Sequence, residues 1–233
     1  VAESGSNSQT ACLAGTYQSS TGQPSCLDSD PGYHVPVSGS DSQTACSPGT
    51  YQPLSSQSSC VDAGYGYYVS SPAATSQDAC SPGTYQPLIG QSSCMSADSG
   101  YFVDGIGSPS QSSCPSGTYQ PSIGQAECTE AEPGYSVSDS GSDSQDQCDL
   151  GTYQPSSGQS ACIQADPGYS VPYLGSYFQV ICEPGTYQPS SAQSSCIEAD
   201  SGFFVDAEGS VAQVPAPLDY YAEGLASTSP EEC

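Results

Sequence analysis

The sequence predicts a small disulfide-rich repeat protein: an elongated rod of short β-hairpins and loops with essentially no α-helix. Twelve of the thirteen cysteines lie alternately 14 and 20 residues apart, which defines a repeat of 34 residues. A fixed period of this length is typical of proteins whose units pack only against their neighbours. There is no Trp and there are only four Phe residues, so one large apolar core cannot form and disulfides have to compensate.

We place the repeat boundaries at the first cysteine of each period. The expected segments are a partial repeat over 1–12, six complete repeats over 12–45, 46–79, 80–113, 114–147, 148–181 and 182–215, and a degenerate half-repeat over 216–233. Val1 aligns with Val35, one period later, so the chain is interpreted as starting within a repeat. It is then either a processed mature chain or a segment of a longer one.

The shorter half of each period runs from one cysteine to the next, 14 residues later. Its copies share the sequence Gly-Thr-Tyr-Gln, as at 49–52. The glycine indicates a turn or a close approach of backbone, and Thr-Tyr-Gln favours a strand that ends at Pro53. We therefore expect each shorter half to be a short hairpin.

The longer half carries an aromatic residue, a valine two residues later and a glutamine before the next cysteine. The aromatic position holds Tyr33, Tyr67, Tyr101, Tyr135, Tyr169 and Phe203, and the valine position holds Val35, Val69, Val103, Val137, Val171 and Val205. This alternation predicts a strand with one buried face, and stacked ladders of Tyr and Val. The glutamines are Gln43, Gln77, Gln111, Gln145, Gln179 and Gln213, and we expect each to bond the backbone of a neighbouring turn.

Charge excludes several classes of partner. The chain has no Lys, no Arg, one His and 25 Asp or Glu residues, for a formal charge of −25. Nucleic acid is excluded as a direct partner because phosphate binding needs clustered Lys or Arg, and an anionic membrane surface is disfavoured for the same reason. No apolar run is long enough for membrane insertion. Disulfides in so polar a chain predict an extracellular protein, at the cell surface or secreted.

The motif C-x-P-G-T-Y-Q-P-x-x-x-Q-S-S-C, read at 46–60, resembles the tandem cysteine-rich repeats of ephrin-receptor-like and tumour-necrosis-factor-receptor-like ectodomains. The resemblance covers the chain from Cys12 to Cys196. In that family the longer half has a disulfide of its own, whereas here Ala63 and its equivalents stand at the opening position and glutamines such as Gln43 at the partner position. The resemblance thus implies that only the bond of the shorter half is kept.

The pairs that the resemblance implies are Cys12 with Cys26, Cys46 with Cys60, Cys80 with Cys94, Cys114 with Cys128, Cys148 with Cys162, and Cys182 with Cys196. A closed loop of about 15 residues contributes roughly 3 kcal/mol, and pairing across the longer half would contribute nearly the same. Loop entropy therefore does not choose between the two schemes. Cys233 is left over, which indicates an intermolecular bond, a continuation of the chain or a bystander.

One longer half is apolar where its copies are polar, which predicts a contact patch. The candidate interface consists of Tyr173, Leu174, Tyr177, Phe178 and Ile181, together with Tyr220 and Tyr221 near the C-terminus. The alternative is that the patch packs on the C-terminal tail of the same chain.

No catalytic constellation or metal site is expected. His34 has no catalytic partners in sequence, and the spaced cysteines lack the Cys and His pairs of zinc sites. Diffuse calcium bridging between chains is the one cation interaction that the acidic surface allows, and no cofactor is expected. Serines near Pro predict O-glycosylation, with candidates Ser55, Ser56, Ser71, Ser108, Ser122, Ser156, Ser157, Ser190 and Ser191.

The functional prediction is an extracellular structural protein and not an enzyme: a glycosylated, acidic subunit that assembles head to tail with itself into a surface fibril or filament. In this interpretation Ala216 replaces an opening cysteine, Cys233 closes a degenerate shorter half, and the next chain completes that repeat. The alternative is a ligand-binding ectodomain or adhesin stalk of a cell-surface receptor-like protein. It predicts one repeat with a distinct exposed patch, whereas the fibril predicts that the patch is buried between subunits.

Overall fold

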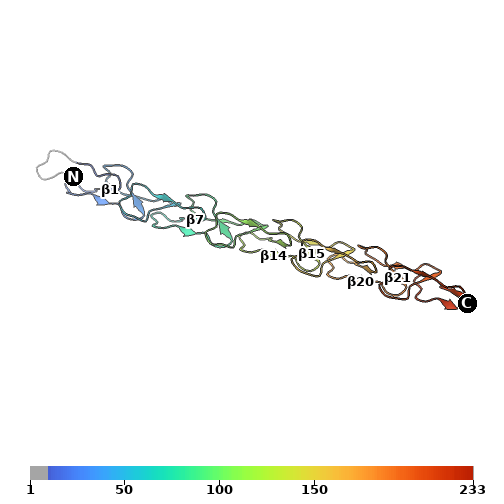
Figure 1. Cartoon of the computed structure of the whole chain (residues 1–233). Coiled ribbons are helices and arrows are strands. Elements are labelled where there is room, and N and C mark those ends of the chain that lie inside the picture. The colour runs from blue at the N-terminus through green and yellow to red at the C-terminus, as the bar shows by residue number, and fades with distance from the viewer. Residues whose placement is uncertain (1–9, 233) are drawn as a thin grey trace. The chain divides into compact units, whose positions relative to one another are not determined.

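The computed structural model describes residues 10–232 and contains no helix among them. The described residues form two-stranded antiparallel sheets, each a hairpin of two very short strands (Figure 1). Six disulfides lie among these hairpins. The structure therefore confirms the predicted fold class of a small disulfide-rich repeat protein built from β-hairpins.

Each hairpin consists of an odd-numbered strand and the even-numbered strand that follows it. The first strands are β1 (Thr16–Tyr17), β3 (Tyr33–His34), β5 (Thr50–Tyr51), β7 (Tyr67–Tyr68), β9 (Thr84–Tyr85), β11 (Tyr101–Phe102), β13 (Thr118–Tyr119), β15 (Tyr135–Ser136), β17 (Thr152–Tyr153), β19 (Tyr169–Ser170), β21 (Thr186–Tyr187), β23 (Phe203–Phe204) and β25 (Tyr220–Tyr221). The second strands are β2 (Leu27–Asp28), β4 (Thr44–Ala45), β6 (Val61–Asp62), β8 (Asp78–Ala79), β10 (Met95–Ser96), β12 (Ser112–Ser113), β14 (Thr129–Glu130), β16 (Asp146–Gln147), β18 (Ile163–Gln164), β20 (Val180–Ile181), β22 (Ile197–Glu198), β24 (Val214–Pro215) and β26 (Glu231–Glu232).

The backbone repeats every 17 residues, half the period of the sequence. The first strands of successive hairpins begin at Thr16, Tyr33 and Thr50, and the register is the same in both kinds of half: Thr50 pairs with Asp62, and Tyr67 with Ala79. The cysteines are spaced unequally, by 14 and 20 residues, because they mark two positions of one hairpin and skip the next. The shorter and longer halves thus have the same fold.

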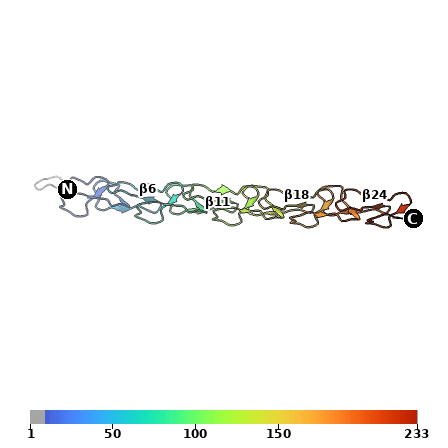
Figure 2. The same ribbon diagram turned by 60° about the horizontal axis from the view of Figure 1, so that its bottom comes forward.

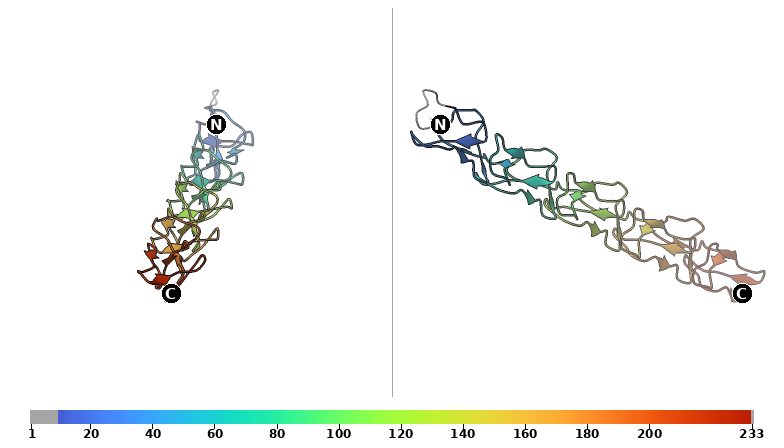
Figure 3. Two further views of the ribbon diagram at one scale, coloured as in Figure 1. Left: turned by 90° about the vertical axis from the view of Figure 1, so that its right-hand side faces the viewer. Right: turned by 60° about the vertical axis from the view of Figure 1, so that its left-hand side comes forward.

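The chain divides into two compact units, one formed by Val1–Ser112 with Ser122–Glu127 and the other by Ser113–Pro121 with Cys128–Cys233. Within each unit the hairpins follow one another in chain order along one direction, which the turned views also show (Figures 2 and 3). Both units have the same plan of hydrogen bonds.

Backbone hydrogen bonds join each hairpin to the next. In the first unit, Gly32 N–H donates to the carbonyl of Gln52 at 2.7 Å, and Val35 N–H donates to the carbonyl of Gln57 at 2.9 Å. The equivalent bonds of the second unit run from Gly168 to Gln188 and from Val171 to Gln193. The hairpins are therefore connected by their main chains, and each needs its neighbour to satisfy its own polar groups.

The small core alternates valine and glutamine at one position of successive hairpins. The predicted Val ladder is buried, with Val35 fully inaccessible, whereas the aromatic residues of the longer half are only half-buried. In the shorter half the same position holds Gln52, whose Nε2 donates to the carbonyl of Ser59 at 2.8 Å and whose Oε1 accepts from Leu54 N–H at 3.1 Å. These bonds compensate for the burial of the amide.

Hairpins of the same kind also contact each other, and the contact requires glycine. A Cβ on Gly49 would overlap the carbonyl oxygen of Gly90, in the next hairpin of the same kind, and φ of Gly49 is +90°. A second left-handed position in each hairpin, in the loop, also accepts Ser56, Ala73 and Ala192. The difference arises because a Cβ at the first position would overlap a backbone carbonyl, whereas a Cβ at the second position, as at Gly90 or Gly107, would meet only side-chain atoms.

Substitution of Gly49 by Ala tests this contact. We expect Gly49→Ala to lower the free energy of unfolding by about 3 kcal/mol, since it combines left-handed strain with an overlap against backbone. Gly22→Ala is the matched control, because φ of Gly22 is +76° and nothing lies within 4 Å of its Cβ position. The control should cost only about 1 kcal/mol in a denaturant titration. Equal losses for the two variants would contradict the close approach.

Candidate functional site

Six hairpins are closed by disulfides, and we call them the disulfide hairpins. The bonds join Cys12 to Cys26, Cys46 to Cys60, Cys80 to Cys94, Cys114 to Cys128, Cys148 to Cys162, and Cys182 to Cys196. These are the pairs that the resemblance implied, with Cα atoms 5.7–5.8 Å apart. In each pair the first cysteine is buried and the second is half-buried.

The six hairpins of the longer halves replace the disulfide with a hydrogen-bonded glutamine, and we call them the glutamine hairpins. Ala63 is buried at the position of the first cysteine, and Gln77 lies at the position of the second and accepts a hydrogen bond from Gly64 N–H at 2.7 Å. The equivalent bonds, at 2.7–2.8 Å, are made by Gln43, Gln111, Gln145, Gln179 and Gln213. The expectation that these glutamines bond the backbone of a turn is confirmed.

The same glutamines also hold a carboxylate where one is present. Gln43 Nε2 donates to Asp30 Oδ2 at 2.7 Å, and Asp98, Asp166 and Asp200 are held in the same way. Glu132 receives a longer bond, of 3.4 Å, from its glutamine. The structure thus gives these acidic side chains a structural partner that the sequence pattern did not indicate.

Most of the predicted interface residues are exposed. Tyr173 is 71% exposed and Tyr177 59%, and the rings of Tyr177 and Phe178 meet edge to face with centroids 5.0 Å apart. Leu174 is also exposed, while Ile181 is half-buried against Gly209. Among the described residues, Tyr173, Leu174 and Tyr177 are therefore not covered by the C-terminal tail of the same chain.

Tyr220 and Tyr221, the remaining predicted interface residues, belong to another hairpin, β25–β26. Both are exposed by smaller fractions, 42% and 37%, and Tyr221 Oη donates a hydrogen bond to Glu231 Oε2 at 2.9 Å. We therefore define the apolar patch by the residues of the hairpin β19–β20 alone: Tyr173, Leu174, Tyr177, Phe178, Val180 and Ile181.

The glutamine hairpin one period earlier, β15–β16, shows which residues stand at the positions of the apolar patch, and we call it the sister hairpin. One period earlier, its six equivalent positions hold Asp139, Ser140, Asp143, Ser144, Asp146 and Gln147. Both hairpins keep the same pairing, Tyr135 with Gln147 and Tyr169 with Ile181. Three acidic residues and three polar ones have therefore been exchanged for apolar ones without a change of backbone.

The serines proposed for O-glycosylation are mostly accessible. Ser55, Ser56, Ser71, Ser122, Ser156, Ser157, Ser190 and Ser191 are exposed. Ser108 is half-buried, and its hydroxyl donates to the carbonyl of Gly105 at 3.1 Å. Ser157 also donates to Glu130 Oε2 at 2.8 Å. A glycan at Ser108 or Ser157 would have to replace these bonds, so these two positions are less favourable acceptors.

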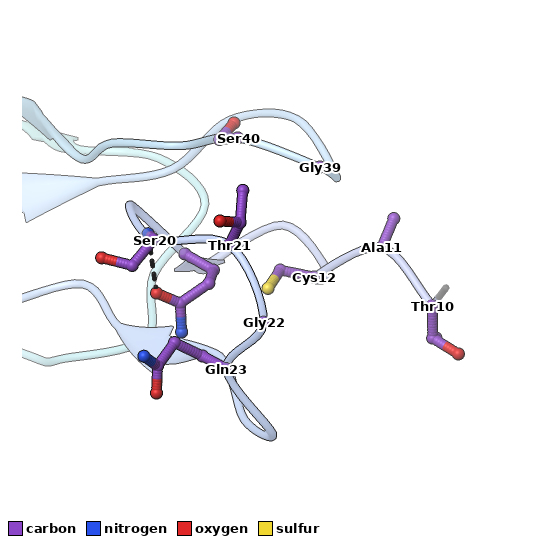
Figure 4. Close-up of a pocket in the computed structure, with 10 residues that line it drawn as sticks. Thr10, Ala11, Cys12, Ser20, Thr21, Gly22, Gln23, Gly39 and Ser40 are labelled. Carbon is purple, nitrogen blue, oxygen red and sulfur yellow. Dashed lines mark hydrogen bonds between the residues drawn. The ribbon is translucent and has the colours of Figure 1, made fainter. Parts of the chain in front are cut away.

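The one polar pocket described in Figure 4 lies in the first unit. It has a volume of about 240 Å³ and is lined by small polar residues that include Ser20, Thr21, Gln23 and Ser40. The backbone N–H of Ser20, one of the lining residues, donates to Gln18 Oε1 at 3.1 Å. Its only sulfur belongs to Cys12, which is disulfide-bonded. The described lining thus offers hydroxyl and amide groups for hydrogen bonds, and it includes no Asp, Glu or His.

The histidine lies beside a disulfide. His34, Cys46 and Cys60 form a cluster whose potential ligand atoms all lie within 4.8 Å of one another. The two sulfurs are bonded to each other, so the cluster has no thiolate to hold a metal ion in this state.

The C-terminal hairpin differs from the sequence interpretation. Cys196 directly precedes β22, whereas Pro230 directly precedes β26. Since Tyr220 pairs with Glu232 as Thr186 pairs with Glu198, Pro230 and not Cys233 occupies the position of the closing cysteine. Cys233 itself lies outside the described residues.

Comparison with known families supports the resemblance. The family model described as tyrosine-protein kinase ephrin type A/B receptor-like matches residues 100–148, a segment that contains the disulfide hairpin from Cys114 to Cys128. The cysteine-rich repeats of this chain thus resemble ephrin-receptor-like repeats. Comparison with curated proteins gives no match. The disulfides and the family match indicate an extracellular or cell-surface location, and the described residues include no helix that could cross a bilayer.

Exchange of a disulfide for the glutamine pair tests whether the two kinds of hairpin are equivalent. Removal of one disulfide by Cys80→Ala with Cys94→Ala should cost about 3 kcal/mol of unfolding free energy. In the matched variant, Cys80→Ala with Cys94→Gln, the glutamine can accept a hydrogen bond from Ser81 N–H, as Gln77 does from Gly64. We expect it to recover about 1 kcal/mol in denaturant titrations. Two variants of equal stability would show that the glutamine contributes nothing at this position.

Proposed function

We propose that this chain is an extracellular structural segment that carries one docking site for a protein partner, the apolar patch of hairpin β19–β20. The scaffold supplies only hairpins that are joined to their neighbours by main-chain bonds. Ephrin-receptor-like repeats are typically non-enzymatic parts of ectodomains, which agrees with a spacing and presenting role. The single observation that carries the proposal is the exposure of the patch on a hairpin that has no acidic residue where the sister hairpin β15–β16 has three.

The charge of the hairpin supports a docking role. From Ser170 to Cys182 the chain has no acidic residue, whereas the equivalent stretch of the sister hairpin, 136–148, has Asp139, Asp143 and Asp146. A partner that contacts the sister hairpin β15–β16 must be cationic there or remove water from its carboxylates. At the apolar patch aromatic and aliphatic side chains can be buried with little electrostatic cost, which is the composition of interface centres.

The second candidate function is a homopolymer, in which the partner is another copy of this chain and the product is a glycosylated surface fibril or filament. The lack of charge in the apolar patch is the observation that favours it, because a second copy carries the same charge of −25 and would be repelled at most other surfaces. A contact from this patch to a different surface of the next copy would be heterologous and would continue into a filament.

The patch can be returned to the polar sequence of its sister by Tyr173→Asp, Tyr177→Asp and Val180→Asp. These residues occur in the same fold at Asp139, Asp143 and Asp146, so the variant should keep its stability. Peptides selected from a displayed library against the native chain should bind the variant at least about tenfold more weakly, since hot-spot aromatics dominate such interfaces. Peptides that bind both proteins equally would overturn the docking proposal.

Sedimentation of the same two proteins separates the two candidates. A native chain that associates as concentration rises, while the triple variant stays monomeric, would support the homopolymer. A native chain that stays monomeric and binds the selected peptides would support a separate partner. Association that is equal in both proteins would exclude the apolar patch as the contact in a polymer.

Intact-mass analysis of the natural material tests the proposed glycosylation. We expect hexose-type mass additions on the exposed serines such as Ser55, Ser156 and Ser190, because an accessible loop serine can enter a transferase site. Ser108, half-buried and bonded to Gly105, should remain unmodified. Peptide mapping that finds an unmodified chain would refute the glycoprotein prediction.

A further inference from the structure

We propose that His34, Cys46 and Cys60 form a zinc-binding site when the Cys46–Cys60 disulfide is reduced. His34 Nδ1 lies 3.1 Å from Cys60 Sγ, and the three potential ligand atoms all lie within 4.8 Å of one another. An imidazole nitrogen and two thiolates are ligands that Zn²⁺ prefers, at bond lengths of about 2.0–2.3 Å. Tetrahedral ligands at these lengths lie roughly 3.5–3.8 Å from one another, so the cluster has nearly the size of a zinc site.

The main chain holds the three ligand residues without help from the disulfide. Cys46 N–H donates to the carbonyl of Gly32, and the carbonyl of Cys46 accepts from Ala73 N–H, both at 2.9 Å. His34 lies in the paired strand β3, and Cys60 directly precedes the paired strand β6. Reduction of the S–S bond therefore frees the two sulfurs while the backbone of each ligand residue keeps its partners.

The glutamine hairpins show that this hairpin backbone can form without a disulfide. Ala63 stands at the position of the first cysteine and Gln77 at that of the second, yet their hairpin has the same strand register as the disulfide hairpin before it. A reduced Cys46–Cys60 hairpin should therefore keep its place between its neighbours, although it loses the loop-entropy contribution of the bond. The Cα atoms of Cys46 and Cys60 are 5.8 Å apart, so rotation of the two side chains is enough to separate the sulfurs.

Histidine distinguishes this disulfide from those beside other glutamine hairpins. At the position of His34, two of these hairpins have a serine: Ser136 Oγ lies 3.5 Å from Cys162 Sγ, and Ser170 Oγ lies 3.6 Å from Cys196 Sγ. Cys, His, Asp and Glu are the usual protein ligands of zinc, and serine is not one of them. Among the described residues, His34, Cys46 and Cys60 are the one group of three such side chains close enough to hold a metal ion.

The disulfide controls whether the site exists. A dithiol reductant gives two electrons and two protons to the Cys46–Cys60 bond, becomes a cyclic disulfide itself, and leaves two thiols. Zn²⁺ then binds the two sulfurs, whose protons pass to water, and the neutral imidazole through Nδ1. A disulfide oxidant that restores the Cys46–Cys60 bond expels the ion.

The exposure of the ligands gives the ion a route of entry. His34 and Cys60 are half-buried, whereas Cys46 is completely buried. The ion therefore meets the imidazole and the Cys60 thiolate before the Cys46 thiolate. Three protein ligands leave the fourth tetrahedral position to water.

Protection from alkylation tests the proposal. The native chain is treated with the phosphine TCEP, added only until labelled Cys60 is detected, so that most disulfides of each chain stay closed, and zinc chloride is added to one half of the sample. N-ethylmaleimide labels the free thiols in a short pulse, and peptic peptides are analysed by mass spectrometry. We expect zinc to slow the labelling of Cys46 and Cys60 at least about tenfold, and that of Cys148 and Cys162 less than about twofold, because the second pair lacks a histidine ligand.

Two matched variants identify the third ligand. His34→Ser copies the residue at Ser136 and should abolish the protection of Cys60. Ser136→His places an imidazole beside Cys162 and should protect that cysteine about tenfold. The two substitutions lie in different units, so a folding defect in one leaves the other interpretable. Protection that is absent in the native chain, equal at all cysteine pairs, or unchanged by His34→Ser would overturn the proposal.

Discussion

A glycine precedes the first strand of every described hairpin except β25–β26, where Asp219 stands, and this glycine is the constraint on which the fold depends. Its N–H donates to the carbonyl of the following hairpin, as from Gly49 to Val69 at 2.7 Å. Its own carbonyl accepts from the residue that follows the second strand of the same hairpin, as from Ala63 N–H at 2.8 Å. Its α-carbon also lies against the backbone of the next hairpin of the same kind. One residue thus links three segments of chain, which a side chain at this position would prevent.

Disulfides and hydrogen-bonded glutamines are two ways of holding a short hairpin closed. A hairpin with two strands of two residues has too few apolar contacts to be stable alone, so its loop has to be tied to its base. Cys46 and Cys60 do this covalently, and Ala63 with Gln77 does it through a hydrogen bond to Gly64. Because the backbone does not depend on which tie is used, hairpin surfaces can vary, and the apolar patch on β19–β20 and the histidine beside Cys60 are two such variations.

These two variations distinguish their hairpins chemically from the other hairpins of the chain. The apolar patch lies on a hairpin without an acidic residue, in a chain of formal charge −25, and so allows close contact there. His34 adds the only ionisable base among the side chains, next to one of six disulfides. Both features occupy positions that face outward or between hairpins, where substitution leaves the main-chain bonds intact.

The sequence alone determined the class of fold, because each recurring residue has one local physical role. The cysteines close a hairpin, Gly allows a left-handed turn, Val buries its methyl groups, and Gln accepts a hydrogen bond from the backbone of a turn. What only the tertiary structure decided was the equivalence of the two halves, since the alignment of Cys46 with Ala63 follows from backbone pairing that unequal cysteine spacing conceals. The approach of His34 to Cys60 likewise joins residues 26 positions apart on different hairpins. No local pattern encodes that distance; it results from how one hairpin packs on the next.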